Sequence, residues 1–376
     1  MATNTTRSDG INRRNELLAT QNDLLREQTN LLRLLVSSNK VPWGGVKFSA
    51  DDRAVFVENI DHDEMRDGFL VTSQRKKLWN VQINLINEFA RICKKHNLRW
   101  FAGYGTLLGA ARHRGFIPWD DDVDIIMFRP DYEKFKLVAA TEIKAPYFLD
   151  IWYNYRLESE GASLNDDEGD FQFITADQRN YQAHISHLPL IKIRDSRTSM
   201  IEFLNRNFID QGIWIDIFPL DPVPPFAEQS QAVNFEVART LLYAAALPQV
   251  IRKAMQEKQP LPLKYDELKK FLALPYRERG RILDNFLKEK FFIHEYVNQF
   301  HQLYYFPNSK PCKTADFTDV TYLPFEKIEV PAPINYDSAL TDCYGDWRKP
   351  VFRQTHVQIY STEISWREYF RKTIIK

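Results

Sequence analysis

The sequence predicts an α+β fold in which helices flank a sheet and a helical subdomain follows. Three observations lead to this prediction. Apolar strand patterns alternate with amphipathic helix patterns between residues 74 and 222. Only helical patterns follow over residues 223–305. Near the N-terminus, pairs of leucines recur every seven residues, which is the spacing of a coiled-coil helix.

Residues 1–40 are interpreted as an N-terminal heptad helix that serves oligomerisation. The leucine pairs lie at Leu17–Leu18, Leu24–Leu25 and Leu31–Leu32. They would form a wide apolar stripe, so the chain is predicted to be a homo-oligomer that assembles through residues 11–36. The alternatives are a helix that packs on its own chain and a helix that lies on a lipid surface. The polar face is not basic, which disfavours the lipid surface.

The rest of the chain divides by pattern into four parts. Residues 41–73 are polar and rich in turn-forming residues, and are interpreted as a linker with little regular structure. Residues 74–222 form the core, residues 223–305 the helical subdomain, and residues 306–376 a C-terminal region. Strands are predicted over residues 98–104, 122–128, 147–155, 188–194 and 212–218, and helices over 74–96, 106–112, 131–140, 228–246, 265–272, 277–300 and 364–374.

The composition is that of a globular protein, with 44% hydrophobic and 27% charged residues. Lys plus Arg and Asp plus Glu each number 50, and this neutrality disfavours a dedicated nucleic-acid binder. Cys93, Cys312 and Cys343 lie far apart and show neither metal-ligand spacing nor a disulfide framework, which indicates a reducing compartment. No apolar run reaches the roughly 18 residues of a membrane helix. We expect a cytoplasmic protein, or one peripheral at the inner face of the membrane.

An acidic cluster that runs into an apolar strand is the most informative feature. Asp122 and Asp124 are two residues apart, so on a strand both side chains would leave the same face, with Cα atoms roughly 6.6 Å apart. Carboxylates at that separation can hold one divalent ion or brace two. Hard oxygen ligands favour Mg²⁺ or Mn²⁺, and burying several carboxylates without a cation would be costly. We therefore predict a metal site here rather than a solvated turn.

The short helix before this cluster adds a candidate phosphate site. Gly105 is the predicted turn, and Gly105 and Thr106 open the helix, whose free backbone N–H groups and dipole favour a phosphate. Arg112 and His113, at the other end of the helix, are predicted to face the ligand. The alternative for these two cations is ordinary surface charge.

A third carboxylate is expected, because metal-assisted phosphoryl transfer commonly needs another acid. Asp216 is the best candidate, since it interrupts an apolar strand whose Ile215 and Ile217 would occupy the opposite face. Asp221 is expected to follow that strand and to cap a turn. In the C-terminal region, Tyr344 and Asp346 are weaker candidates on the acceptor side, because aromatic rings can stack on sugars or on cations. The alternative for the aromatic residues there is an ordinary place in the core.

Four motifs resemble those of the LicD family, the bacterial phosphocholine transferases related to fukutin-related protein. They are GTLLGAARHRGFIPWDDDVDI (Gly105 to Ile125), IKIRDSRT (Ile191 to Thr198), WIDIFPLD (Trp214 to Asp221) and YGDW followed by Pro350. The first motif is long and specific. The similarity covers residues 74–222 with a weaker echo at 340–350, so the N-terminal heptads and the predicted helical subdomain lie outside it.

The resemblance implies a nucleotidyltransferase-type mixed sheet and a CDP-alcohol donor, usually CDP-choline. The phospho-alcohol would move to a hydroxyl of a cell-surface glycan, such as lipopolysaccharide, teichoic acid or capsule, lipid-linked in some cases, and CMP would leave. The resemblance makes Asp122, Asp124 and Asp216 both the catalytic residues and the ligands of Mg²⁺ or Mn²⁺. It also implies that Gly105 and Thr106 contact the donor phosphates. Lys192 and Arg194 would be cations near donor or acceptor, the alternative being exposed positions at a strand end.

Three other functions remain compatible with these residues. A strict nucleotidyltransferase would use the same carboxylates to attack an α-phosphate and would release pyrophosphate. A polyol-phosphate transferase would take CDP-ribitol or CDP-glycerol at the same metal site. An inactive oligomeric scaffold would use only the heptads, and the intact acidic residues disfavour it.

Overall fold

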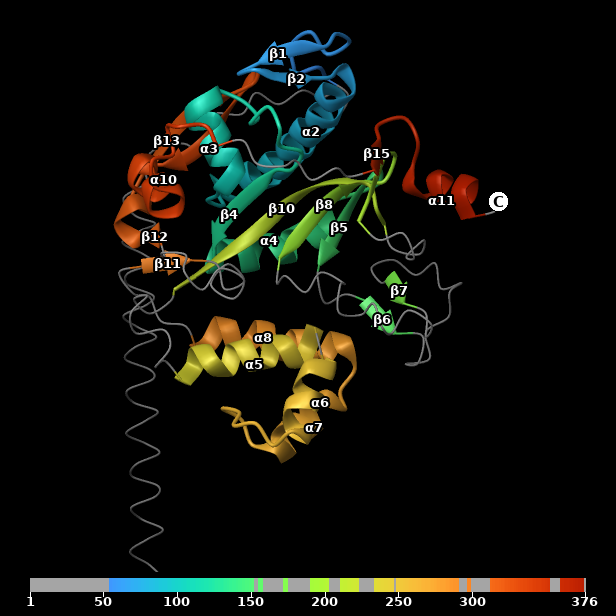
Figure 1. The fold of residues 1–376 in the computed structure, drawn as a ribbon, viewed down its shortest axis with the longest axis vertical. Helices are drawn as coiled ribbons and strands as arrows, with labels where there is room; N and C mark the ends of the chain where they lie inside the picture. Colours follow the sequence, from blue (N-terminus) through green and yellow to red (C-terminus); the bar gives the residue numbers. More distant parts are fainter. Residues whose placement is uncertain are drawn as a thin grey trace, which may run out of the picture. The chain divides into compact units, whose positions relative to one another are not determined.

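The computed structural model describes residues 54–151, 155–157, 172–174, 190–202, 210–222, 233–246, 248–290, 296–298, 312–351 and 359–374. The heptads of residues 11–36, and with them the predicted oligomerisation helix, lie outside the described residues. None of the helices in the described ranges is both long and apolar enough to cross a membrane. A mixed sheet and several helices make up the described parts (Figure 1), which confirms the predicted α+β fold class.

A mixed sheet lies at the centre of the fold. Among the described residues its strands are β3 (Phe101–Ala102), β4 (Asp124–Phe128), β5 (Tyr147–Ile151), β8 (Ile191–Asp195), β10 (Ile213–Pro222), β11 (Tyr296–Asn298) and β12 (Cys312–Lys313). The long strand β10 pairs in parallel with β4 and antiparallel with β8 and β11. The other pairs, β3 with β4, β5 with β8 and β11 with β12, are antiparallel.

Two helices cover one face of this sheet. Helix α2 (Ser73–His96) packs on β8 and β10, and α4 (Arg129–Glu142) packs on α2, β4 and β10. The bounds of α2 match the sequence prediction because local signals define both ends. The Thr72 hydroxyl accepts a hydrogen bond from the Arg75 N–H at 3.2 Å, and Asn97 ends the helix in the left-handed conformation.

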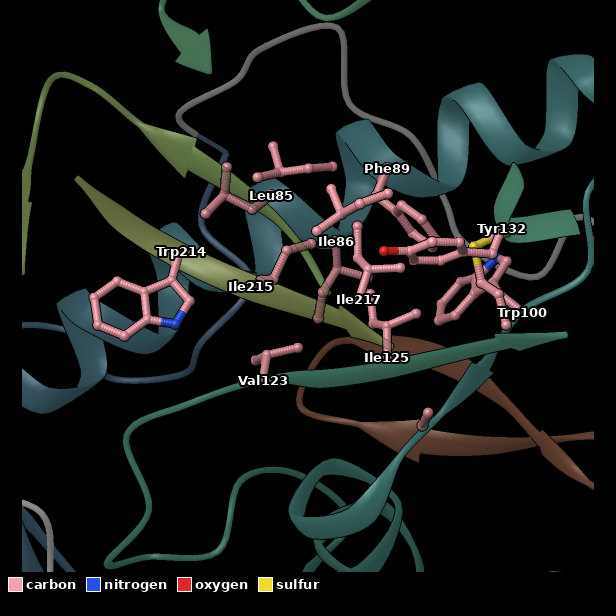
Figure 2. Close-up of a cluster of buried hydrophobic side chains, with 14 of the residues drawn as sticks. Leu85, Ile86, Phe89, Trp100, Val123, Ile125, Tyr132, Trp214, Ile215 and Ile217 are labelled. Carbon is pink, nitrogen blue, oxygen red and sulfur yellow. The ribbon is translucent and has the colours of Figure 1, made fainter. Parts of the chain in front are cut away.

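The main core lies between α2 and the sheet. Figure 2 shows Leu85 and Phe89 from α2 beside Ile215 and Ile217 from β10, whereas the indole of Trp214 lies apart from that cluster. Side chains alternate between the two faces of a strand. The isoleucines of β10 are therefore buried against α2. Trp214 and Asp216 lie on the opposite face of the strand, away from α2.

The segment predicted as a linker, residues 41–73, departs from that prediction in its described part. Strands β1 (Glu64–Arg66) and β2 (Phe69–Val71) form an antiparallel hairpin, and Val57 and Val71 are fully buried. Asp67 and Gly68 connect the strands, both with positive φ (50° and 78°). An Asp-Gly pair of this kind is a strong signal for a two-residue hairpin turn, and it outweighs the polar composition of the segment.

Three predicted element boundaries near the acidic cluster also need correction. The strand predicted over residues 98–104 is reduced to β3, because Gly103 already caps helix α3 (Tyr104–His113). Gly105 is therefore in the first turn of α3 rather than in a turn before it. Asp122 precedes β4, so it is not on a strand with Asp124. The premise that these two carboxylates leave one face of one strand is wrong.

The helical part contains α5 (Val233–Ala246), α6 (Pro248–Gln256), α7 (Tyr265–Leu272) and α8 (Tyr276–Lys290). The helix predicted over residues 277–300 ends ten residues early, because residues 296–298 form β11 and pair with the end of β10. Shorter strands away from the central sheet are β6 (Tyr155–Leu157), β7 (Gln172–Ile174) and β9 (Ser199–Ile201), of which β6 and β7 pair in parallel.

The C-terminal region returns to the core near α3. It contains the 3₁₀ turn Thr314–Phe317, the hairpin β13 (Val320–Phe325) and β14 (Ile328–Pro333), α10 (Tyr336–Tyr344), β15 (Ile359–Ser361) and α11 (Trp366–Ile374). Helix α10 packs on α3, β12 and β14, and β13 packs on α3. The YGDW motif at the end of α10 is thereby placed beside the helix that follows β3.

Asp221 does not cap a turn, contrary to the prediction. It lies inside β10, fully buried, and accepts a hydrogen bond from Arg129 Nε at 2.6 Å. A second buried carboxylate, Asp284 of α8, contacts Arg129 at 3.3 Å and Lys136 at 2.6 Å. This buried ion cluster joins β10, α4 and α8.

Candidate active site

Two of the predicted carboxylates are brought together by the parallel strand pair. Asp124 at the start of β4 and Asp216 in β10 are direct register partners, and paired strands lie about 4.8 Å apart. The Asp216 N–H donates to the Val123 carbonyl at 2.8 Å, which extends the pairing one residue beyond β4. Asp216 follows Trp214 on the face opposite the isoleucine core. The closeness of Asp124 and Asp216 therefore depends on strand register.

The loop before β4 supplies further carboxylates. One oxygen from each of Asp120, Asp121 and Asp122 lies within 4.8 Å of the others. Side chains of α2 hold this loop in place: Arg75 and Trp79 donate to the Asp120 carbonyl at 2.9 and 3.0 Å. A third residue of α2, Gln82, donates to the Asp121 carbonyl at 2.8 Å.

Burial and mutual repulsion disfavour the ionised forms of these carboxyls. Burial, reinforced by the charge of Asp122, raises the pKa values of Asp120 and Asp124 well above their usual range. Asp216 also contributes to the shift of Asp124. Burial raises the pKa of Asp216 itself to about 6, although Lys192 opposes this shift. A buried cluster with this much excess negative charge would be stabilised by a bound cation.

Lys192 and Arg194 lie on the other side of Asp216 and are buried rather than exposed at a strand end. Lys192 is the register partner of Asp216 on β8, and its Nζ lies 3.2 Å from Asp216 Oδ1 and 2.9 Å from Glu202. Arg194 pairs with Glu202 at 2.7 Å and with Asp150 at 2.8 Å. Both cations lie over the ring of Trp214, at 4.2 and 5.0 Å from its centroid.

Glu202 is a member of this network that sequence reasoning missed. Burial would raise its pKa, but Lys192 and Arg194 lower it to about 2. No local pattern distinguishes Glu202 from other acidic residues, because its role arises only when the chain after β9 returns to β8. Asp120, also missed, could have been found as a neighbour of Asp122 in the acidic run.

Gly105 and Thr106 both contact the acidic cluster. The Gly105 N–H donates to the Asp124 carboxylate, and a Cβ on Gly105 would lie 2.8 Å from Asp120 Oδ2. The Thr106 hydroxyl accepts a hydrogen bond from the Asp124 N–H at 2.8 Å. These contacts orient Asp124. Contact of Gly105 and Thr106 with donor phosphates stays a prediction.

Removing the Thr106 hydroxyl is expected to weaken both stability and activity. Thr106→Val would leave the Asp124 N–H without its partner, at a cost of about 1–3 kcal/mol in the free energy of unfolding. Thr106→Ser keeps the acceptor and is the matched control. Urea unfolding and turnover measured on both variants check this. Equal behaviour of the Val and Ser variants would show that the bond does not position Asp124.

Arg112 and His113 have protein partners in the described structure. Arg112 donates to the Trp347 carbonyl at 2.8 Å, so it ties α3 to the YGDW motif. His113 Nδ1 lies 2.6 Å from Asp67 of the β1–β2 hairpin, and burial lowers the pKa of His113. A direct contact of either residue with the ligand stays a prediction.

Two tyrosines border the acidic cluster. Burial, Cys343 and the charge of Asp124 raise the pKa of Tyr344 well above its usual range, and Tyr104 is shifted in the same direction mainly by burial. Tyr104 begins α3 with φ at 37°, a conformation that is uncommon for non-glycine residues. Sequence reasoning missed Tyr104. Asp346, by contrast, is exposed and pairs with Lys349 at 2.8 Å.

Comparison with known proteins gives matches within the region that holds this site. Residues 97–229 match the family described as LicD/FKTN/FKRP, nucleotidyltransferase domain. The lipopolysaccharide cholinephosphotransferase LicD of Haemophilus influenzae is 31% identical over 144 residues, which are 38% of this chain and 43% of that protein. An uncharacterized protein of Rickettsia typhi is 38% identical over 84 residues, 22% of this chain and 25% of that protein. The chain thus matches less than half the length of these relatives.

The matched range contains the acidic loop, Asp124 and Asp216. The candidate site therefore lies within the range that is similar to this nucleotidyltransferase domain. Over residues 97–229 the chain thus resembles the LicD family.

Proposed function

We propose that this protein transfers a phospho-alcohol, in the form of phosphocholine, from a CDP-activated donor to a hydroxyl of a cell-surface glycan, with release of CMP. The observation that carries the proposal is the half-buried register pair of Asp124 and Asp216 beside the acidic loop, within a range that matches the LicD family. The similarity to a lipopolysaccharide cholinephosphotransferase supports choline as the alcohol and lipopolysaccharide as the class of acceptor.

The donor set fits a divalent cation. Asp122, Asp124 and Asp216 would hold Mg²⁺ or Mn²⁺ through carboxylate oxygens, the ligands these ions prefer, and Asp120 lies close enough to contribute. The raised pKa values of Asp120 and Asp124 support this assignment, because uncompensated charge is what a cation would neutralise. A bound ion would neutralise the donor pyrophosphate and the CMP leaving group.

The chain's own groups would then orient the reactants and move one proton. Asp216 would either hold the metal or, if it does not, accept the proton of the acceptor hydroxyl; with a pKa of about 6 in the absence of metal, it is mostly ionised at neutral pH. Lys192 would hold the carboxylate in place through its 3.2 Å ion pair. Thr106 and Gly105 would fix Asp124 through their hydrogen bonds. Tyr344 would border the acceptor side.

The decisive experiment follows the nucleotide products. The full chain is given CDP-choline, CDP-glycerol or CDP-ribitol, with lipopolysaccharide, teichoic acid or capsule as acceptor, and with Mg²⁺ or EDTA. Metal-dependent CMP release that requires both CDP-choline and lipopolysaccharide is the expected result. CMP from another donor would reassign the alcohol. Pyrophosphate release from a nucleoside triphosphate, with no CMP from any donor, would instead identify a nucleotidyltransferase.

Metal binding is expected to stabilise the protein more at pH 7.5 than at pH 5. The pKa of Asp216 rises on folding from 3.8 to about 6, so this group favours the folded state at low pH. That contribution to stability is lost as the pH rises from about 4 to 6. Above this window the Asp216 carboxylate is ionised, so a metal ion can bind where the proton was. Saturating Mn²⁺ at 100 times its Kd would add about 2.7 kcal/mol. Thermal unfolding with Mn²⁺ or EDTA at both pH values measures this.

The control for the metal experiment is Asp266→Asn. Asp266 is exposed on α7 and pairs with Lys269, away from the acidic cluster, so this variant should keep the full stabilisation. Asp124→Asn should lose it. A Mn²⁺ effect of the same size in both variants would place the bound ion elsewhere.

A further inference from the structure

Two cysteines that are far apart in the sequence meet beside the candidate site. The sulfur of Cys312 in β12 lies 4.0 Å from the sulfur of Cys343 in α10, and both thiols are free. Strand β12 is part of the central sheet, and α10 packs directly on it. The third cysteine, Cys93, is 1% exposed within the core. The chain therefore contains one thiol pair and one isolated buried thiol.

The two thiols of the pair are not equivalent. Cys343 is exposed, whereas Cys312 is buried, with 8% of its surface exposed. The contact between the two sulfurs lowers the pKa of Cys343 and, together with burial, raises that of Cys312. The thiolate is the reactive form of cysteine. Cys343 thus has the accessibility and the ionisation of an attacking thiol, and Cys312 is placed to resolve it.

The pair is joined to the site through the next residue in the chain. Tyr344 follows Cys343, and its phenol is influenced by the charges of Asp124, Asp120 and Asp122. The chain then turns at Gly345, and Trp347 is tied to Arg112 of α3. A displacement of the end of α10 would therefore move Tyr344 relative to the acidic cluster.

We propose that Cys312 and Cys343 form a peroxide-sensitive dithiol whose reversible disulfide alters the Tyr344 side of the active site. The Cys343 thiolate attacks one oxygen of hydrogen peroxide, the O–O bond breaks, and the departing hydroxide takes a proton to become water. Cys312 then attacks the sulfur of the Cys343 sulfenic acid, the S–O bond breaks, and a second water leaves with the Cys312 proton. The thiol pair loses two electrons, and one peroxide becomes two waters.

The size of the movement follows from bond geometry. A disulfide holds its sulfurs about 2.05 Å apart, so the present 4.0 Å separation must close by about 2 Å. Side-chain rotation supplies part of this change. Because β12 is held in the sheet through β11, the remainder falls on the end of α10, which carries Tyr344.

The test counts thiols in the full chain. Reduced protein is exposed to a series of hydrogen peroxide concentrations, denatured, alkylated and analysed by peptide mass spectrometry. We expect a Cys312–Cys343 disulfide with Cys93 still alkylated, and full alkylation again after dithiothreitol. Cys312→Ser should stop at the Cys343 sulfenic acid. If both thiols stay free, or if Cys93 is oxidised at the same concentration, the proposal is wrong.

Two further measurements test the consequence for the site. Amide hydrogen exchange should slow in peptides of α10 after oxidation and stay unchanged in the buried part of α2. Unchanged exchange in α10 would overturn the structural half of the proposal, whatever the activity. The effect on transfer rests on the proposed function: oxidation should lower turnover about tenfold or more, reversibly, in the wild type but not in the Cys312→Ser/Cys343→Ser variant. Full activity of the disulfide form would overturn the regulatory half.

If the protein shows no transfer in either redox state, the dithiol proposal and the proposed transfer activity can still be judged separately. The disulfide and the exchange change would then still confirm the dithiol, and only the proposed phospho-alcohol transfer would fail.

Discussion

Asp124→Asn is expected to abolish transfer and to leave the protein folded. Three contacts hold Asp124 in place: Asp216 is its register partner, Thr106 accepts from its N–H, and Gly105 donates to its side chain. An amide of the same shape removes the charge that a cation would bind. Loss of one preorganised charged group typically costs about 10²–10³-fold in rate, and loss of a metal ligand can cost more.

The same substitution should not lower the thermal stability of the protein. Burial and the neighbouring carboxylates disfavour the ionised form of Asp124, which is why its pKa is raised. In EDTA the Asn variant should therefore be at least as resistant to heat as the wild type, because a repulsive buried charge is gone. Turnover assays and thermal unfolding check both effects, with the exposed Asp266→Asn as control. An Asp124→Asn protein with metal-dependent turnover would remove Asp124 from the site.

Arg129→Gln is expected to cause the largest loss of stability. Arg129 is buried between Asp221 of β10 and Asp284 of α8, and Lys136 pairs with Asp284. The substitution would leave Asp221 as an uncompensated charge, 0% exposed. Removing one partner of a buried ion pair costs about 3–5 kcal/mol. The midpoint of urea unfolding measures the change.

A double variant distinguishes a buried charge from lost packing. Arg129→Gln/Asp221→Asn removes both charges, so much of the lost stability should return relative to Arg129→Gln alone. Arg239→Gln, which removes an exposed partner of Glu236 on α5, should change stability by less than about 1 kcal/mol. Equal losses for the buried and exposed arginines would show that the cluster does not hold α8 to the sheet.

The elements that local signals define could be predicted closely. Helix α2 is the best case, because its apolar spacing, the Thr72 cap and the basic last turn all agree within one segment. The β1–β2 hairpin carries an equally local signal at Asp67 and Gly68, but the surrounding polar composition hides it. The predicted oligomerisation helix lies outside the described residues and stays a prediction.

The candidate site could be predicted as a set of residue types but not as an arrangement. Asp122 and Asp124 were expected as a pair on one strand, whereas the direct neighbour of Asp124 is Asp216 on another. Pairing between strands distant in the sequence is set by tertiary packing, which no spacing rule encodes. The same holds for Lys192, which meets Asp216 only once β8 and β10 are adjacent.

The parallel pairing of β4 with β10 also has a consequence for how the site comes into being. Because Asp124 and Asp216 approach each other only through a contact of long sequence separation, the chain must close a large loop before their carboxylates meet. During synthesis on the ribosome, a chain that ends before β10 contains Asp124 but not yet Asp216, so the acidic cluster is incomplete. Changes in the length of the intervening chain can accumulate without disturbing the centre, provided that the alignment of these two strands is kept.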